Sequence, residues 1–203
     1  GVGGMGELFG LMYGEGYRLA TFVNANNVNE EREPGENGDW NPSKTNRGLI
    51  TTRQAGMHHD VSDKFGKWSN TLDAKASWQD TNNEQTYHSE RYRNEGNIFS
   101  GGFSSNKSKN NDFKITENFR LNKPYYLRAG AELSYNTRDK NISSSDSTWQ
   151  TRLTNSSESL SKSLQKTFNA SGRIIMSNRA PCDNGAYDIG VNAAYERISP
   201  SEN

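Results

Sequence analysis

Three histidines and the carboxylates near them are the residues of this 203-residue chain that could bind a metal ion. His58 and His59 are adjacent, and neighbouring side chains of an extended strand point to opposite faces, so this pair cannot chelate one ion. His58 and Asp60 would share a face, but two ligands do not make a site. His88 is distant from both in sequence. We therefore expect these residues to be polar strand positions and not a metal centre.

Other familiar signatures of chemistry are equally incomplete. The run Gly1–Gly6 matches the GxGxxG pattern of dinucleotide-binding proteins, but no predicted strand precedes it. Asp80, Asn82 and Glu84 alternate like the start of a calcium-binding loop, yet the glycine and the final glutamate of such a loop are missing. The sequence holds no nucleophile elbow and no phosphate-binding loop. We expect no catalytic site, no bound metal and no cofactor, and hence a protein that is not an enzyme.

The composition narrows the class of protein. Basic and acidic residues number 24 each, so the net charge is zero, which argues against nucleic-acid binding. A single cysteine, Cys182, excludes an internal disulfide. Apolar residues make up only 31% of the chain, whereas aromatic residues reach 10%, too many for a typical disordered tail. The chain is therefore either disordered or folded into strands that need only half of their residues to be apolar.

Alternation of apolar and polar residues is the dominant pattern. From Trp68 to Asp80 every apolar residue occupies an even position and every odd position is polar, which is typical of a half-buried strand. The same period of two predicts strands at 112–122, 125–137, 163–177 and 186–197. It is less regular along 17–27, where Phe22 falls among the polar positions, and along 50–61. The segment 7–13 is a further candidate strand.

The predicted connections alternate between short and long. Short turns are expected at 14–16, 62–67, 122–124 and 178–185, and long polar stretches occupy 28–49, 81–111 and 138–162. Compact soluble domains rarely hold several such long loops, whereas transmembrane β-barrels have short turns at one end and long loops at the other. The two ends of the second stretch, Thr86–Tyr92 and Asn97–Ser104, are suited to pair as a protruding hairpin. The sequence thus predicts an all-β, antiparallel up-and-down sheet of about 7–8 strands that forms part of a transmembrane β-barrel.

In a barrel of this kind the two parities of each strand have different surroundings. We expect the apolar parity to face lipid on an accessible, convex surface: Leu72, Ala74, Ala76, Trp78, Leu127, Ala129, Ala131, Leu133, Tyr135, Ile189, Val191, Ala193 and Tyr195. We expect the polar parity to line the lumen: Thr71, Asp73, Lys75, Ser77, Arg128, Glu132, Ser134, Asp188, Asn192 and Glu196. Two charged residues on the lipid parity, Glu117 and Lys166, should lie toward the ends of the apolar band.

Three segments follow one another in a distinctive order: the run Tyr17-Arg18-Leu19 with the loop Asn26–Asn29, the strand entry Gly48–Thr52, and the turn Val61–Gly66 with the strand after it. In order and spacing they resemble bacterial outer-membrane β-barrel proteins of the TonB-dependent-receptor-like family. The resemblance implies that residues 1–203 are a fragment of one barrel domain in the outer membrane, without the plug and the remaining strands. It further implies lipid as a partner, an unidentified ligand at the extracellular loops, and an energy-coupling inner-membrane partner reached through regions outside this chain. The expected function is ligand uptake or surface binding.

Two alternatives remain open from the sequence. A soluble, secreted β-sandwich that serves binding or adhesion would bury the apolar parities of its strands in one closed core. A disordered segment would show no regular alternation, which the patterns at 68–80 and 126–136 contradict. The accessibility of the apolar parity distinguishes a barrel from a sandwich.

Overall fold

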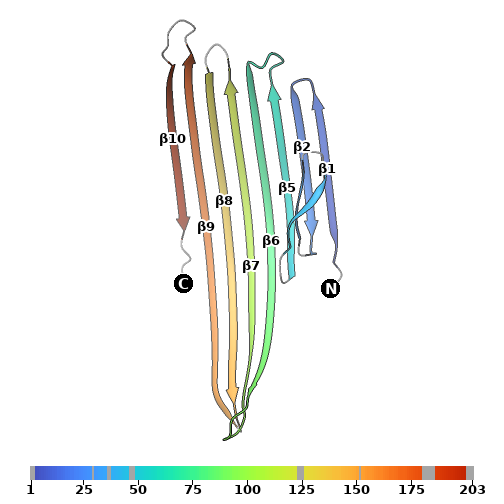
Figure 1. The fold of residues 1–203 in the computed structure, drawn as a ribbon, viewed down its shortest axis with the longest axis vertical. Coiled ribbons are helices and arrows are strands. Elements are labelled where there is room, and N and C mark those ends of the chain that lie inside the picture. Colours follow the sequence, from blue (N-terminus) through green and yellow to red (C-terminus); the bar gives the residue numbers. More distant parts are fainter. Residues whose placement is uncertain are drawn as a thin grey trace.

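The computed structural model describes residues 3–28, 30–35, 38–45, 49–122, 126–150, 152–179 and 186–199. These form strands throughout, with no helix in the described ranges (Figure 1). The strands are β1 (Met5–Gly14), β2 (Tyr17–Asn26), β3 (Glu30–Pro34), β4 (Trp40–Thr45), β5 (Leu49–Ser62), β6 (Trp68–Arg91), β7 (Ile98–Leu121), β8 (Tyr126–Trp149), β9 (Leu153–Arg179) and β10 (Ala186–Ser199).

Eight of these strands form one open sheet in the order β1-β2-β5-β6-β7-β8-β9-β10, and every neighbouring pair is antiparallel. Apart from the inserted β3 and β4, the spatial order follows the chain order. The predicted all-β, up-and-down antiparallel sheet is therefore confirmed, and each predicted strand coincides with part of an observed one, with at most one residue outside it. Alternation determines this outcome because each residue of a strand points to the face opposite that of its neighbours.

The two described short turns, at 14–16 and 62–67, lie at one end of the sheet, shown at the top of Figure 1. The backbone amide of Ser62 donates to the carbonyl of Gly16 at 2.7 Å, and Lys64 forms an ion pair with Glu15 at 2.7 Å. Gly16 has a φ of 79°, a left-handed conformation that glycine adopts at little cost. The two described turns thus lie at the same end, as predicted, and they also contact each other. Residues 123–125 and 180–185, which hold most of the other two predicted turns, lie outside the described residues.

The stretches 81–111 and 138–162 lie at the end opposite the short turns, as predicted, but they are mostly strands and not loops. Strands β6 to β9 continue through both stretches and reverse only between Arg91 and Ile98 and between Trp149 and Leu153. Pairing of Thr86 with Phe103 and of Arg91 with Ile98 confirms the protruding hairpin. The stretches lack an apolar parity, but their backbone groups still pair in full ladders, and a solvated extension needs no apolar face.

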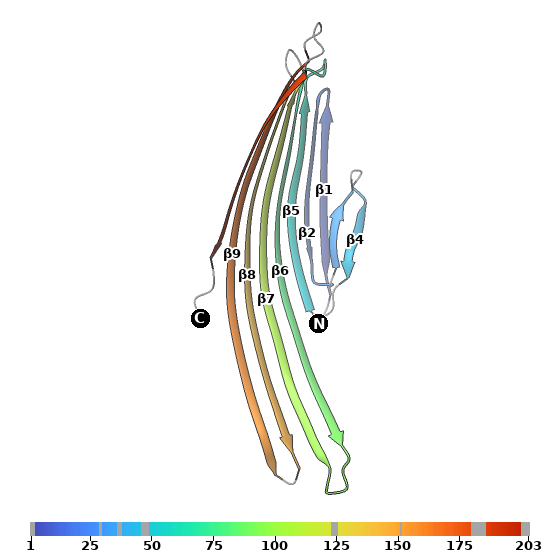
Figure 2. The ribbon, with the colours of Figure 1, turned by 60° about the vertical axis from the view of Figure 1, so that its left-hand side comes forward.

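The long stretch 28–49 also contains structure that the sequence pattern did not predict. Strands β3 and β4 pair there as a small hairpin, which lies on the concave side of the bowed sheet (Figure 2). Its Trp40 packs edge-on against Phe22 of β2, with 6.1 Å between ring centroids, and Glu33 forms an ion pair with Lys75 of β6. The side chain of Phe22 covers Gly56, where an added Cβ would lie 2.2 Å from the ring. The irregular parity of Phe22 therefore serves to dock this hairpin.

Candidate functional site

The pairing register divides the sheet into two faces. On the first, Ala74 pairs with Ile115 and Ile115 with Leu133. Leu133 in turn pairs with Ala170, and Ala170 with Tyr195. All of the residues expected to face lipid fall on this face by register, which we call the apolar face: Leu72, Ala74, Ala76, Trp78, Leu127, Ala129, Ala131, Leu133, Tyr135, Ile189, Val191, Ala193 and Tyr195.

The apolar face is accessible. Leu133 is 47% exposed, Ile174 is 54% exposed and Tyr195 is 57% exposed. No second sheet covers this face among the described residues, because the β3–β4 hairpin packs on the other side. Ile50 is the one buried hydrophobic residue of the described chain, and by register it belongs to the face that carries the hairpin. The geometry is the reverse of a sandwich, which buries its apolar parity.

A row of aromatic rings crosses the apolar face and marks where it ends. It consists of Trp78, Phe113, Tyr135, Phe168 and Tyr195, which we call the aromatic row. Ring centroids are 5.5 Å apart between Trp78 and Phe113, 6.5 Å between Phe113 and Tyr135, and 6.4 Å between Phe168 and Tyr195. Three of these residues were expected to face lipid, but Phe113 and Phe168 were not among the lipid-facing candidates. Both lie on the apolar parity of the predicted strands 112–122 and 163–177, and this parity could have identified them.

The aromatic row and the short turns enclose a band of limited height. This apolar band covers positions 68–78 of β6, 113–121 of β7, 127–135 of β8 and 168–176 of β9. Segments of about 9–11 residues are what a transmembrane strand needs to cross the hydrocarbon region of a bilayer. Beyond the row the same four strands continue with mainly polar residues on both faces, such as the serines at 143–145. Phe103, Leu160 and Leu164 are exposed apolar exceptions there.

Glu117 corrects one expectation about this band. It was predicted near an end of the band but pairs with Leu72 and Ala131, halfway between Phe113 and Leu121. Its carboxylate accepts a hydrogen bond from Asn70 Nδ2 at 3.4 Å. A neighbouring amide can thus lower the cost of a charge that the alternation alone would not predict there. Lys166 lies two residues beyond Phe168, at the end of the band as predicted.

The opposite face, which we call the polar face, collects the residues expected to line the lumen. Thr71 pairs with Asn118, Asn118 with Gly130, and Gly130 with Arg173, whose partner on β10 is Asn192. By the same register this face holds Thr71, Asp73, Lys75, Ser77, Arg128, Glu132, Ser134, Asp188, Asn192 and Glu196. The register alone assigns the residues of β10 to their faces. It places Ile189, Val191 and Ala193 on the apolar face, and Asp188, Asn192 and Glu196 on the polar face.

The side chains of the polar face interact across strands. Lys114 Nζ lies 3.0 Å from Glu132 Oε2, and Asn169 Nδ2 donates to Ser134 Oγ at 3.3 Å. Beneath the β3–β4 hairpin the most buried side chains are themselves polar, with Asn24 fully buried and Thr52 2% exposed. This face therefore buries polar groups, whereas the apolar face is exposed.

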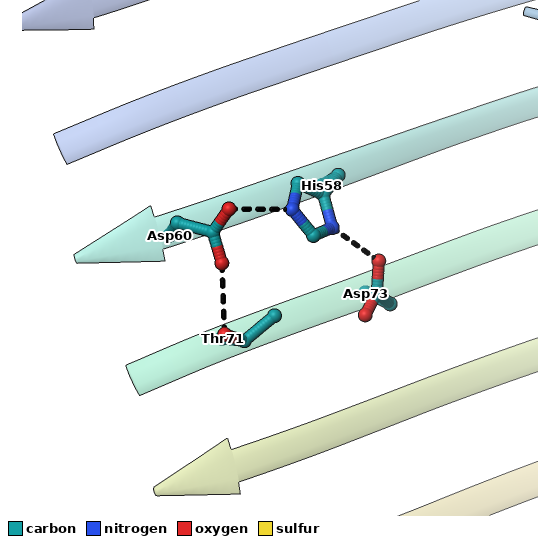
Figure 3. A network of polar contacts seen from close by, with 4 residues as sticks. All are labelled: His58, Asp60, Thr71 and Asp73. Carbon is teal, nitrogen blue, oxygen red and sulfur yellow. Dashed lines mark hydrogen bonds and ion pairs between the residues drawn. The ribbon is translucent and has the colours of Figure 1, made fainter. Parts of the chain in front are cut away.

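His58 is the centre of a polar network on this face (Figure 3). Its Nδ1 lies 2.5 Å from Asp73 Oδ1, and its Nε2 lies 2.6 Å from Asp60 Oδ2. Thr71 Oγ1 donates to the other oxygen of Asp60 at 2.8 Å. Ionised carboxylates only accept hydrogen bonds, so two of them satisfy both ring nitrogens when the imidazole is protonated.

The His58 network is not arranged to hold a metal. The two carboxylates lie on opposite sides of the ring, so they do not converge with it on one point (Figure 3). In the part of the chain that the structure describes, no group of three or more histidine, cysteine, aspartate or glutamate residues is placed to coordinate an ion. His58 and Asp60 were expected to share a face. Their contact with Asp73 was not expected, because Asp73 is distant from both in sequence.

Beyond the apolar band, Tyr87 of β6 contacts β8. Its hydroxyl donates to Asp146 Oδ1 at 2.7 Å. This hydrogen bond, together with the negative charge of Asp146, raises the pKa of the Tyr87 phenol above its ordinary value of 10.0. The contact ties two strands together in the polar extension.

Comparison with known proteins gives no relative: no family model, no curated protein and no solved structure matches the chain. No helix within the described residues is long and apolar enough to cross a bilayer. Functional inference therefore rests on the two faces of the sheet.

Proposed function

We propose that this chain forms part of the wall of an outer-membrane β-barrel, of the TonB-dependent-receptor-like kind, that serves ligand uptake or surface binding. The observation that supports this most directly is the exposed apolar face. It has the height of a membrane-spanning strand and ends at a row of aromatic rings, as the lipid-facing side of such barrels does.

The other face supports the same proposal. Its charged and amide side chains pair across strands, and a hairpin from a connecting segment folds onto it, as a loop does when it narrows a lumen. A soluble sandwich would need its small second sheet to cover the apolar face instead. The polar extension of β6 to β9 would then project from the membrane on the side of the ligand, and the short turns would lie on the periplasmic side. An inner-membrane partner for energy coupling belongs to the proposal only through the family resemblance.

The four tryptophans of the chain provide a direct test. They lie on β4, β6 and β8: Trp40 beside the polar face, Trp68 and Trp78 at the two ends of the apolar band, and Trp149 in the extension. Phe99, which stacks on Trp149, is fourteen residues along β7 from Phe113, or roughly 45 Å at the usual rise of a strand. Only Trp68 and Trp78 should contact lipid.

The experiment uses single-tryptophan variants of the full-length protein in phospholipid vesicles. Brominated lipids, which quench fluorescence on contact, should quench Trp78 and Trp68 strongly and leave Trp149 and Trp40 nearly unchanged. Equal quenching at Trp78 and Trp149, or a protein that stays folded and monomeric in water without lipid or detergent, would overturn the proposal.

A further inference from the structure

Three arginines surround a hollow in the polar face near the short-turn end of the sheet. Arg120 of β7, Arg128 of β8 and Arg173 of β9 all line it, and its volume is about 590 Å³. Gly130 and Ser171 also line it. All three arginine side chains are exposed on this face and none belongs to the His58 network.

The register holds these arginines close together. Arg120 is directly opposite Arg128, and Arg173 is opposite Gly130, which makes it a diagonal neighbour of Arg128. Directly opposed side chains lie about 5 Å apart at Cβ, and like charges in that position are destabilising. At Gly130 an added Cβ would lie 3.3 Å from Asn118 Oδ1, so a side chain here would begin to fill the hollow. The sheet keeps the centre of the cluster open.

By register, no acidic residue directly opposes these arginines. Apart from one another, they are opposed by Ser69, Gly130, Ile175 and Asn192. Among the described residues that line the hollow, Glu132 is the one carboxylate, and its Oε2 is held by Lys114 Nζ at 3.0 Å. The hollow therefore has a local surplus of about three positive charges, which an anion from solution would offset.

We propose that this hollow binds the phosphate group of a small molecule. Guanidinium groups present pairs of N–H donors that match phosphate oxygens in a bidentate manner, and three of them balance a dianion better than a monoanion. Side chains beside them, such as Ser171, supply further hydrogen-bond donors. A phosphorylated molecule would then meet the arginine cluster on the lumen side of the wall.

The inference rests on the proposed function only in placing the hollow on the lumen side of a barrel wall. The binding of phosphate itself requires only the polar face. It is tested by calorimetric titration of inorganic phosphate into the full-length protein in detergent at low salt. We expect saturable binding that weakens by about tenfold or more in Arg128→Gln and in Arg173→Gln, because charge-assisted hydrogen bonds are lost. Arg128→Lys, which keeps the charge but loses the paired donors, should give an intermediate loss. Arg138→Gln, on the same strand and face but beyond the apolar band, is the matched control and should bind like the parent.

Three results would overturn the proposal: no saturable binding of phosphate, equal losses in Arg138→Gln and Arg128→Gln, or tighter binding of citrate than of phosphate. Denaturant unfolding of each variant checks that it is folded; because Arg173 has no directly opposed arginine, Arg173→Gln remains informative if Arg128→Gln does not fold. Phosphate binding without lipid quenching of Trp78 would support the site and refute the barrel. Lipid quenching without phosphate binding would refute the site alone.

Discussion

An arginine introduced at Ile174 should destabilise the protein in a membrane, although the same change on the surface of a soluble protein would cost almost nothing. Ile174 of β9 is 54% exposed on the apolar face and pairs with Ala129 and Val191. Its diagonal neighbours across β8 are Leu127 and Ala131, so the register provides no carboxylate to pair with the new charge. The substitution thus measures what this face contacts.

The size of the effect follows from the position of Ile174 within the band. The band on β9 covers 168–176, so Ile174 lies two residues from its centre at Gly172. At about 3.3 Å per residue and a strand tilt of about 40°, this is roughly 5 Å from the midplane of the bilayer. Arginine costs about 2–4 kcal/mol at the midplane and about 0–1 kcal/mol near the interfaces, so we expect a loss of about 2 kcal/mol. For an exposed position in water the change would stay within about 0.5 kcal/mol.

The assay is equilibrium unfolding of the full-length protein from phospholipid vesicles by denaturant, followed by tryptophan fluorescence. Thr116→Arg is the matched control, because Thr116 also lies near the middle of the band but on the polar face, opposite Asp73 and Glu132. It should leave the free energy of unfolding nearly unchanged. If Ile174→Arg costs no more than Thr116→Arg, the apolar face does not contact lipid and the argument from its height and aromatic border fails.

Further expectations concern single residues. Glu117→Leu should raise the free energy of unfolding in vesicles by about 1–2 kcal/mol, because a carboxylate at mid-band is costly in lipid; a decrease would contradict its placement. Gly16→Ala should lower stability by about 2–3 kcal/mol, because the new Cβ would lie 2.5 Å from the carbonyl oxygen of Ser62 at a φ of 79°. Gly66→Ala, with a φ of 65° and open space around it, should cost only about 1 kcal/mol, and similar losses at both sites would refute the steric argument. Asp146→Asn should lower the pKa of Tyr87 toward its ordinary value, since the carboxylate that opposes phenolate formation is removed, and spectrophotometric titration against Tyr87→Phe measures this.

The sequence alone determined the strands and their two faces. Residues such as Leu72, Ala74 and Leu133 could be assigned to one face because the pleat of a strand fixes a period of two, whatever the strand packs against. The antiparallel order of neighbours followed from the short turns, such as that at Gly14–Tyr17. A connection of so few residues must bring the next strand back beside the previous one in the opposite direction. These features depend on local geometry, and so a single sequence carries them.

Three features were decided only by the tertiary structure. The polar stretches after Gln79 and Arg138 form strands because neighbouring backbones satisfy each other's hydrogen bonds, and this pairing leaves no mark in the side-chain pattern. Asp73 could be connected with His58 only through the register of β5 and β6, which sets residues distant in sequence side by side. The arginine hollow belongs with this second feature, since its members also come together through the register, from three strands.

The third feature is the hairpin on the polar face. In the sequence Phe22 and Ile50 contradict the alternation of their strands, and nothing nearby explains them. In the fold Phe22 packs against Trp40 of the hairpin, and Ile50 is buried on the same face. A residue on the wrong parity is stable only where another segment covers it, because burial against a distant partner replaces the contacts that its own strand does not provide.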